Sequence, residues 1–156
     1  MRIALTGTPG TGKTKLSKKL AKKLGYELID LNKLIKKEKV YDDYDRKRKS
    51  YIVDIKKLNK FVRKIIKDNV IIDSHLSHYL PQRLIDVVIV LRCKPEVLKK
   101  RLKNKKWNKE KIRENYEAEL IGLISYEAKQ LHKKVYEIDT TNKGIDNIIK
   151  EIVKNL

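Results

Sequence analysis

The chain has 156 residues, a length that suits one compact domain and is too short for two separate cores. Its 39 lysine and arginine residues outnumber the 20 acidic residues, which gives a net charge of +19. No apolar run approaches the length of about 18 residues that a membrane-spanning helix needs, and the single cysteine, Cys93, excludes an internal disulfide. We therefore expect one cytoplasmic domain, residues 1–156, with no membrane partner and with Cys93 in a structural role.

The large positive charge has several interpretations that the sequence leaves open. A lysine-rich, glutamine-poor composition is compatible with a heat-adapted organism, in which the charges form a solvated surface. A positive field of this size also attracts nucleotides and RNA without specifying either. A nucleic-acid or ribonucleoprotein partner is therefore one hypothesis and a merely solubilising surface is the other.

The first element is an apolar strand, Arg2–Thr6, followed by Gly7–Thr14, which matches the phosphate-binding pattern G-x-x-x-x-G-K-[ST]. The glycines let successive backbone N–H groups point at phosphate oxygens, Lys13 reaches the β- and γ-phosphates, and the Thr14 hydroxyl can ligate Mg²⁺. An amphipathic helix follows and ends near Gly25, so the loop lies at a helix N-terminus. The pattern predicts a site for ATP or GTP.

Strand-like runs recur along the chain and alternate with helical patterns. They lie at Arg2–Thr6, Tyr26–Ile29, Val70–Asp73, Val87–Leu91 and Val135–Ile138. Helical periodicity covers Asp54–Asp68, Pro95–Leu102, Glu110–Leu131 and Ile145–Leu156. This alternation predicts an α/β protein of the P-loop NTPase fold, with a five-stranded parallel sheet and helices on both faces.

Two segments interrupt the alternation. Glu38–Ser50 is crowded with charged residues and tyrosines, which excludes a core element and suggests a mobile flap. Asn104–Lys109 is a short basic insert between two helices and contains the only tryptophan. Phosphoryl transfer requires that water be kept out, so we expect one segment to cover the acceptor and the other to form a lid over the phosphates.

The strand Val70–Asp73 ends in an acidic residue at the sheet edge where open α/β proteins bind their ligands. Asp73 could hold a Mg²⁺-bound water. His75 is expected to orient an attacking water or the acceptor phosphate, and His78 to be a polar loop residue; a metal site formed by these histidines is the weaker alternative. Further cations that could clamp phosphates follow at Arg83, Arg92, Arg101 and Arg113.

These motifs together resemble the adenylate kinase isoenzyme 6 family. The resemblance covers nearly the whole chain and includes the phosphate loop, Val40–Asp45, the Asp73-x-His75 pair, Leu80–Arg83 and the strand end Val90–Arg92. It continues through Arg101–Leu102, Trp107–Asn108, Glu114–Asn115 and Thr141–Lys143. Members of this family have a nucleoside monophosphate kinase fold, phosphorylate AMP with ATP, hydrolyse ATP, and act in small-subunit ribosomal RNA maturation with a small-subunit ribosomal protein.

The resemblance also implies roles for individual residues. ATP phosphates would be bound by Gly10, Gly12, Lys13, Thr14 and Lys15. Asp73 and His75 would form a Walker B-like pair and, with Lys13, the catalytic residues. The acceptor segment would span about 30–52, with Lys36, Arg83 and Arg92 as candidate acceptor ligands, and the lid would span about 104–114.

The chain departs from the family pattern at three positions. Lys105 and Lys36 stand where arginines are expected, so an ammonium group replaces a planar guanidinium group that could bind a phosphate through two hydrogen bonds. Leu76 follows His75 where glycine is expected, so the backbone there is less permissive.

Three functions from different classes follow from these features. The first is an adenylate kinase and ATPase that serves ribosome assembly, with Mg²⁺ as the cofactor. The second is a nucleotide-switched RNA or ribosomal-protein binding module with incidental kinase activity. The third is a small-metabolite kinase on the same fold.

Overall fold

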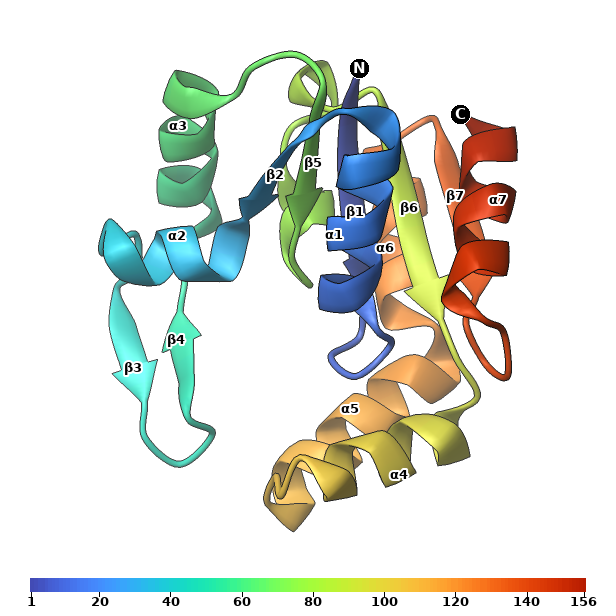
Figure 1. Cartoon of the computed structure of the whole chain (residues 1–156). Helices are drawn as coiled ribbons and strands as arrows, with labels where there is room; N and C mark the ends of the chain where they lie inside the picture. The colour runs from blue at the N-terminus through green and yellow to red at the C-terminus, as the bar shows by residue number, and fades with distance from the viewer.

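The computed structural model describes residues 1–156 and is built around a five-stranded parallel sheet (Figure 1). The strands are β1 (Arg2–Gly7), β2 (Glu27–Asp30), β5 (Val70–Asp73), β6 (Val87–Arg92) and β7 (Val135–Asp139), in the order β2-β5-β1-β6-β7. All five strands that the sequence predicts are present, with ends shifted by at most one residue. The predicted fold class is confirmed.

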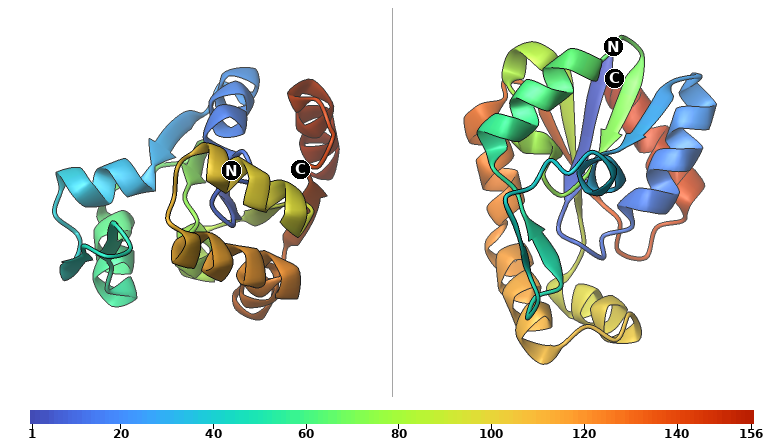
Figure 2. Two further views of the ribbon diagram at one scale, coloured as in Figure 1. Left: turned by 90° about the horizontal axis from the view of Figure 1, so that it is seen from below. Right: turned by 90° about the vertical axis from the view of Figure 1, so that its left-hand side faces the viewer.

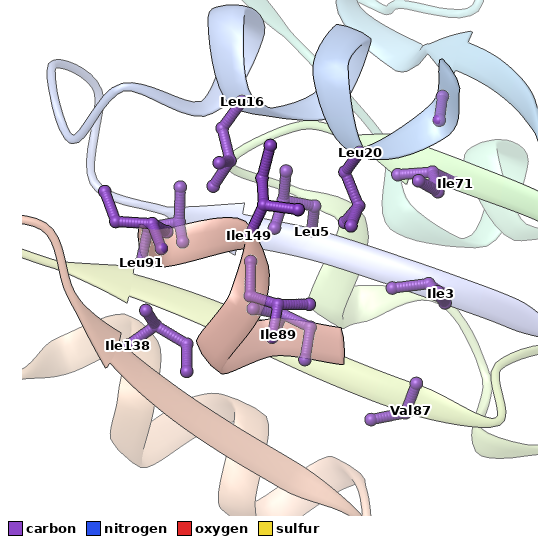
Figure 3. Close-up of a cluster of buried hydrophobic side chains, with 13 residues drawn as sticks. Ile3, Leu5, Leu16, Leu20, Ile71, Val87, Ile89, Leu91, Ile138 and Ile149 are labelled. Carbon is purple, nitrogen blue, oxygen red and sulfur yellow. The ribbon is translucent and has the colours of Figure 1, made fainter. Parts of the chain in front are cut away.

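Helices cover both faces of the sheet (Figures 1 and 2). On one face lie α1 (Lys13–Leu24) and α7 (Ile145–Asn155); on the other lie α2 (Leu31–Lys37), α3 (Ile55–Ile65) and α6 (Leu123–Leu131). Side chains of β1 alternate between these layers, so Ile3 and Leu5 pack with α1 and α7 (Figure 3), whereas Ala4 packs on the opposite side. The central strands β5, β1 and β6 are therefore buried on both faces, which explains their apolar sequences, whereas the edge strands β2 and β7 are partly exposed.

Glu38–Ser50, which the sequence marks as a charged interruption, contains the first strand of a small antiparallel hairpin and the beginning of the second. Its strands are β3 (Asp43–Asp45) and β4 (Ser50–Ile52), and it extends away from the main sheet (Figure 1). Tyr51 packs against both Tyr41 and Tyr44, with ring centroids 4.5 and 5.0 Å apart. The tyrosines therefore form a local aromatic cluster that orders the hairpin without a place in the main core.

A helical pair projects beyond the carboxyl ends of the strands. It consists of α4 (Pro95–Asn104) and α5 (Lys109–Ile121), joined by the turn that contains Trp107. Cys93, Leu98, Leu102 and Ile112 form a small separate core between these helices, which agrees with the structural role expected for Cys93. Burial raises the pKa of the Cys93 thiol to about 11, so the thiol stays protonated.

The single helix predicted over Glu110–Leu131 is wrong, because the chain breaks at Gly122 into α5 and α6. Gly122 has φ 68, a left-handed conformation that costs glycine little, and a Cβ there would lie 3.3 Å from Nη1 of Arg92. Two short 3₁₀ turns, η1 (Ser77–Tyr79) and η2 (Gln82–Leu84), connect β5 to β6. None of the helices combines the length and apolar character needed to span a bilayer.

Candidate active site

The phosphate loop connects the end of β1 to α1. The side chain of Lys13, at the start of α1, folds back onto the first residues of the loop. Lys13 Nζ donates to the carbonyl oxygens of Gly7 and Thr8, at 2.7 and 3.2 Å. Burial lowers the pKa of Lys13 to about 8, and the nearby Asp73 carboxylate partly opposes that shift. Gly12, Thr14 and Lys15 are exposed at the start of α1, so this end of the loop is open to a ligand.

The base of the helical pair packs directly on the phosphate loop. A Cβ added to Gly10 would lie 2.8 Å from Leu98 Cδ1 and 3.0 Å from Leu102 Cδ2, and the φ of Gly10 is 95. Arg101 Nη1 also donates to the Gly10 carbonyl at 3.2 Å. Gly10 is therefore needed both for the backbone conformation and for the close approach of α4.

Asp73 lies at the carboxyl end of β5, next to the phosphate loop. Its side chain is buried, and Oδ2 accepts a hydrogen bond of 2.7 Å from the Ser17 hydroxyl. Burial raises the pKa of Asp73, while the Ser17 hydrogen bond and the charge of Lys13 act in the opposite direction. Ser17 lies one turn after Thr14 on α1. Its hydrogen bond therefore links α1, which carries Thr14, to Asp73 on β5, and these are the two residues predicted to bind Mg²⁺.

His75 follows Asp73 and is half-buried. Burial lowers its pKa to about 4, and the positive charges of Lys13 and Lys111 contribute in the same direction. The imidazole is therefore neutral at physiological pH. A neutral imidazole can both donate and accept a hydrogen bond, as the orientation of water requires.

The expectation that His78 is a polar loop residue is wrong. The side chain is 1% exposed and bridges two elements: Nδ1 lies 3.0 Å from the Thr6 hydroxyl on β1, and Nε2 lies 3.0 Å from a Glu127 carboxylate oxygen on α6. Its carbonyl oxygen also accepts from His132 Nε2 at 2.8 Å. His78 therefore anchors the loop that carries His75, since both of its ring nitrogens are engaged.

Lys105 occupies the position at which α4 ends, within the predicted lid segment. Its charge lowers the pKa of Lys13, which places it in the electrostatic neighbourhood of the phosphate loop. On α5, Lys111 stacks over the Trp107 ring at 4.0 Å and influences the pKa of His75. Positive charge from the helical pair therefore acts on Lys13 in the phosphate loop and on His75 after β5.

The predicted acceptor segment, residues 30–52, contacts the loop after Asp73 through α2. Asn32 Oδ1 accepts a hydrogen bond of 2.8 Å from the Ser74 hydroxyl, directly after Asp73. Lys36 lies four residues after Asn32, hence on the same side of the helix, and is exposed. The structure thus places Lys36 on the helix face that contains the contact to the Asp73 loop.

The turn of the hairpin contacts α5 and the N-cap residue of that helix through polar groups. Arg48 Nη2 lies 2.8 Å from Glu114 Oε1, and Lys47 Nζ lies 3.1 Å from Glu110 Oε2. Asn108 Nδ2 also donates to the carbonyl of Lys47 at 3.2 Å. The two segments predicted to cover the acceptor and the phosphates are therefore joined to each other by polar contacts.

The structure does not bring Arg83 and Arg92 to this position as phosphate ligands. Arg92 directs its guanidinium to Glu119 at 2.7 Å, to Glu137 at 2.9 Å and to Ser125 at 3.2 Å, so its donors are used internally. Arg83 lies on η2, beside the outer surface of α3. We assign neither residue to the candidate active site. Arg113 is exposed on α5.

Sequence reasoning missed several residues that support the site, among them Ser17, Asn32, Lys111 and Glu119. Glu119 is 2% exposed and accepts a hydrogen bond of 2.6 Å from the Thr8 hydroxyl of the phosphate loop. A helix of alternating charges such as Lys109–Ile121 carries no signal that one carboxylate is buried. Ser17, in contrast, could have been noticed, because it interrupts a lysine-rich helix one turn after Thr14.

The sheet order, the phosphate loop after β1 and the helical pair above it define a P-loop nucleotide-binding domain of the kinase type. Solved structures with this fold include the YorR protein from Bacillus subtilis in complex with phosphorylated GDP, with a TM-score of 0.67, 21% identity, and coverage of 99% of this chain and 94% of that one. Shikimate kinase from Bacteroides thetaiotaomicron gives a TM-score of 0.64, 18% identity, and coverage of 99% and 96%. At these identities the likeness concerns the fold.

Sequence relatives define the family more narrowly. A family model described as an AAA domain matches residues 3–122. Proteins named "Putative adenylate kinase" are 44% identical over 156 residues in Methanocaldococcus jannaschii and 45% identical over 154 residues in Pyrococcus abyssi. The matches cover 99% and 98% of this chain and 85% and 82% of those proteins. The chain belongs to this AAA-domain family, together with these archaeal relatives.

Proposed function

We propose that the protein is an adenylate kinase that transfers the γ-phosphoryl group of ATP to AMP, giving two molecules of ADP. The observation that carries the proposal is the 2.8 Å contact between Arg48 of the hairpin and Glu114 of α5, which joins the predicted acceptor cover to the predicted lid. Transfer between two nucleotides requires a cover over each of them, and two covers that meet satisfy this requirement. The names of the archaeal relatives support the same activity.

In this proposal the protein acts mainly by positioning and by positive charge. Gly10, Gly12, Lys13, Thr14 and Lys15 hold the ATP phosphates. Lys105 adds charge from the lid, residues 104–114. Lys36, on the acceptor segment 30–52, meets the phosphate of AMP on the opposite side. Each lysine supplies a compact ammonium charge instead of the planar guanidinium group of an arginine. The lysines therefore stabilise the negative charge of the phosphoryl groups without fixing the orientation of those groups.

The residues present also fit the magnesium ion that accompanies ATP. The Thr14 hydroxyl is exposed, and Asp73 offers Oδ1, which accepts no hydrogen bond from the protein, while Ser17 holds Oδ2. Thr14 would be a direct ligand and Asp73 would act through a bound water. When bound, the ion neutralises charge on the phosphates.

We further propose that the protein hydrolyses ATP in the absence of AMP. His75 is neutral, lies two residues after Asp73 and is close enough to Lys13 for that charge to lower its pKa, which suits a residue that orients a water molecule towards the γ-phosphate. The proposed biological role is maturation of small-subunit ribosomal RNA together with a small-subunit ribosomal protein. Its support is the family resemblance and the net charge of +19.

One incubation series tests these activities. The protein is mixed with Mg²⁺ and ATP plus AMP, or with Mg²⁺ and ATP alone, and the adenine nucleotides are resolved. ADP at twice the molar amount of AMP consumed is expected in the first mixture, and slow release of ADP and phosphate in the second. Consumption of ATP that does not depend on AMP would contradict the kinase proposal and leave the ATPase. Absence of both reactions would contradict both activities.

A further inference from the structure

A strongly basic groove lies on the outer surface of α3, outside the candidate active site. It has a volume of about 490 Å³ and is lined by Lys56, Asn59, Lys60, Arg63, Pro81 and Arg83. Four of these six residues carry a positive charge and none carries a negative charge. We call this feature the α3 groove.

The groove is formed by two segments of the chain. Lys56, Lys60 and Arg63 are spaced by four and three residues, so they lie along one face of α3. Leu58 and Val62 occupy the opposite face and are buried against the sheet. Arg83 lies on η2 and adds a fourth positive charge to the three on α3.

The four cations of the groove have no partners within the protein. Lys56, Lys60, Arg63 and Arg83 form no ion pair and no side-chain hydrogen bond, whereas four of the other six arginines have internal partners (Arg2, Arg48, Arg92 and Arg101). A concave surface with charges of one sign focuses the electrostatic field and concentrates ligands of the opposite sign. These features are typical of a surface that a polar, negatively charged ligand completes.

The groove is separate from the nucleotide site. The backbone N–H of Asp86, three residues after Arg83, donates to the carbonyl of Arg2 at the beginning of β1, whereas the phosphate loop follows the end of that strand. Six residues of a parallel strand span roughly 17–20 Å. The η2 segment and the end of α3 lie side by side at the end of the sheet that contains the N-terminus (Figure 2). A ligand in the groove is therefore neither the ATP nor the AMP of the proposed reaction.

We propose that the α3 groove binds the sugar–phosphate backbone of RNA. The stretch from Lys56 to Arg63 is about 10 Å long, which suits successive phosphates of one strand better than a single small anion. No aromatic side chain lines the groove, so binding is directed at the backbone and is independent of base sequence. This inference rests on the RNA part of the proposed function, and not on the kinase activity.

Two triple variants of equal charge test the groove. Lys56→Gln/Lys60→Gln/Arg63→Gln removes three groove cations, and Lys18→Gln/Lys22→Gln/Lys23→Gln removes three exposed cations of α1. The dissociation constant of a labelled 20-nucleotide oligouridine, and of its deoxy counterpart, is measured between 50 and 300 mM salt. Circular dichroism and ATP–AMP transfer verify that both variants fold. Single strands contribute about 0.7 to the slope of log K against log salt for each phosphate contact.

The groove variant is expected to bind oligouridine about 10- to 100-fold more weakly at 100 mM salt and with a slope smaller by about 2, whereas the α1 variant stays within about twofold of the unmodified protein. The deoxy oligonucleotide carries the same phosphates and is expected to lose affinity in the groove variant by a similar factor. Equal losses of RNA affinity in both variants would overturn the α3 groove proposal alone. Failure of the unmodified protein to bind RNA at 50 mM salt would overturn the RNA part of the proposed function as well.

Discussion

The carboxylate of Glu119, near the end of α5, accepts a hydrogen bond of 2.6 Å from the hydroxyl of Thr8 in the phosphate loop. The same carboxylate accepts from Arg92 Nε at 2.7 Å and from the backbone N–H of Cys93 at 3.2 Å. One buried acidic group therefore links the helical pair, the end of β6 and the phosphate loop. This link makes the position of α5 sensitive to the conformation of the loop.

We predict that Glu119→Gln destabilises the protein by about 2 kcal/mol, because it removes the negative partner of charge-assisted hydrogen bonds in a buried setting. The KM for ATP should also rise, since Thr8 loses its acceptor. Urea denaturation and steady-state kinetics measure the two effects. Glu117→Gln, two residues earlier on the same helix and exposed, is the matched control and should change neither quantity. Equal behaviour of the two variants would show that Glu119 is not a structural link.

Replacement of Lys13 tests the phosphate loop itself. Lys13→Ala should lower phosphoryl transfer by at least about 100-fold while the circular dichroism spectrum stays unchanged, because the side chain supplies charge to the transferred group and lies outside the hydrophobic core. Lys13→Arg preserves the charge but not the geometry and should recover only part of the activity. Activity of Lys13→Ala near that of the unmodified protein would contradict the role of this loop.

The lowered pKa of Lys13 predicts a pH dependence of ATP binding. The free site carries its full positive charge below a pKa of about 8 and loses that charge as the pH rises above this value. The affinity for ATP should therefore be constant between pH 7 and 7.5 and fall above pH 8, approaching tenfold per unit, until the higher pKa of the occupied site is reached. Calorimetric titration from pH 7 to 9.5 measures this change. Lys13→Arg, which stays charged throughout, should remove the decline.

His75 should affect turnover more than binding. His75→Ala is expected to reduce ATP hydrolysis by about 100- to 10,000-fold with the ATP dissociation constant changed by less than about threefold, because the imidazole is proposed to orient water. Because the pKa of His75 is about 4, no loss of activity from its protonation is expected between pH 5.5 and 7. His78→Asn is the structural comparison and should instead lower the thermal midpoint. A large loss of ATP affinity in His75→Ala would indicate that its loop is structural.

The contact between the hairpin and α5 allows a charge-swap test. Arg48→Glu should raise the KM for AMP several-fold, because the cover over the acceptor loses its contact with Glu114, and Arg48→Glu/Glu114→Arg should restore it. Exposed pairs contribute less than about 1 kcal/mol to stability, so the unfolding free energy should hardly change in either variant. If the double variant behaves as the sum of two damaging substitutions, the contact has no part in closure.

The central strands β5, β1 and β6 could be predicted from the sequence because each is buried on both faces and reads as an apolar run. The edge strands β2 and β7 are more polar and could be placed by their alternation with helical segments. The phosphate loop could be predicted because its glycines occupy fixed positions. The hairpin at 43–52 could not, since three-residue strands held by Tyr51 and its neighbours leave no period that distinguishes them from a charged loop. The break at Gly122 was hidden because the apolar pattern continues through it.

Individual site residues were predictable only where the local sequence decides their place. Asp73 and His75 follow a strand that must end at the ligand edge, so their place could be inferred. Arg92 also follows such a strand, but its orientation is decided by Glu119 and Glu137, which lie 27 and 45 residues further along the chain. Pairings over such distances are a property of the folded protein and have no local signal.

The main sheet ends on one side at β2, whose outer edge pairs with no other strand. An unpaired strand edge can recruit a strand from another molecule, and natural proteins protect such edges with short strands and charge. Here the strand has only four residues, begins with Glu27, ends with Asp30, and is flanked by Lys33, Lys37, Lys64 and Lys67. The four lysines and two acidic residues of this edge sum to +2, so two such edges repel each other, which disfavours self-association through β2. Because mobile ions weaken that repulsion, the protection depends on ionic strength.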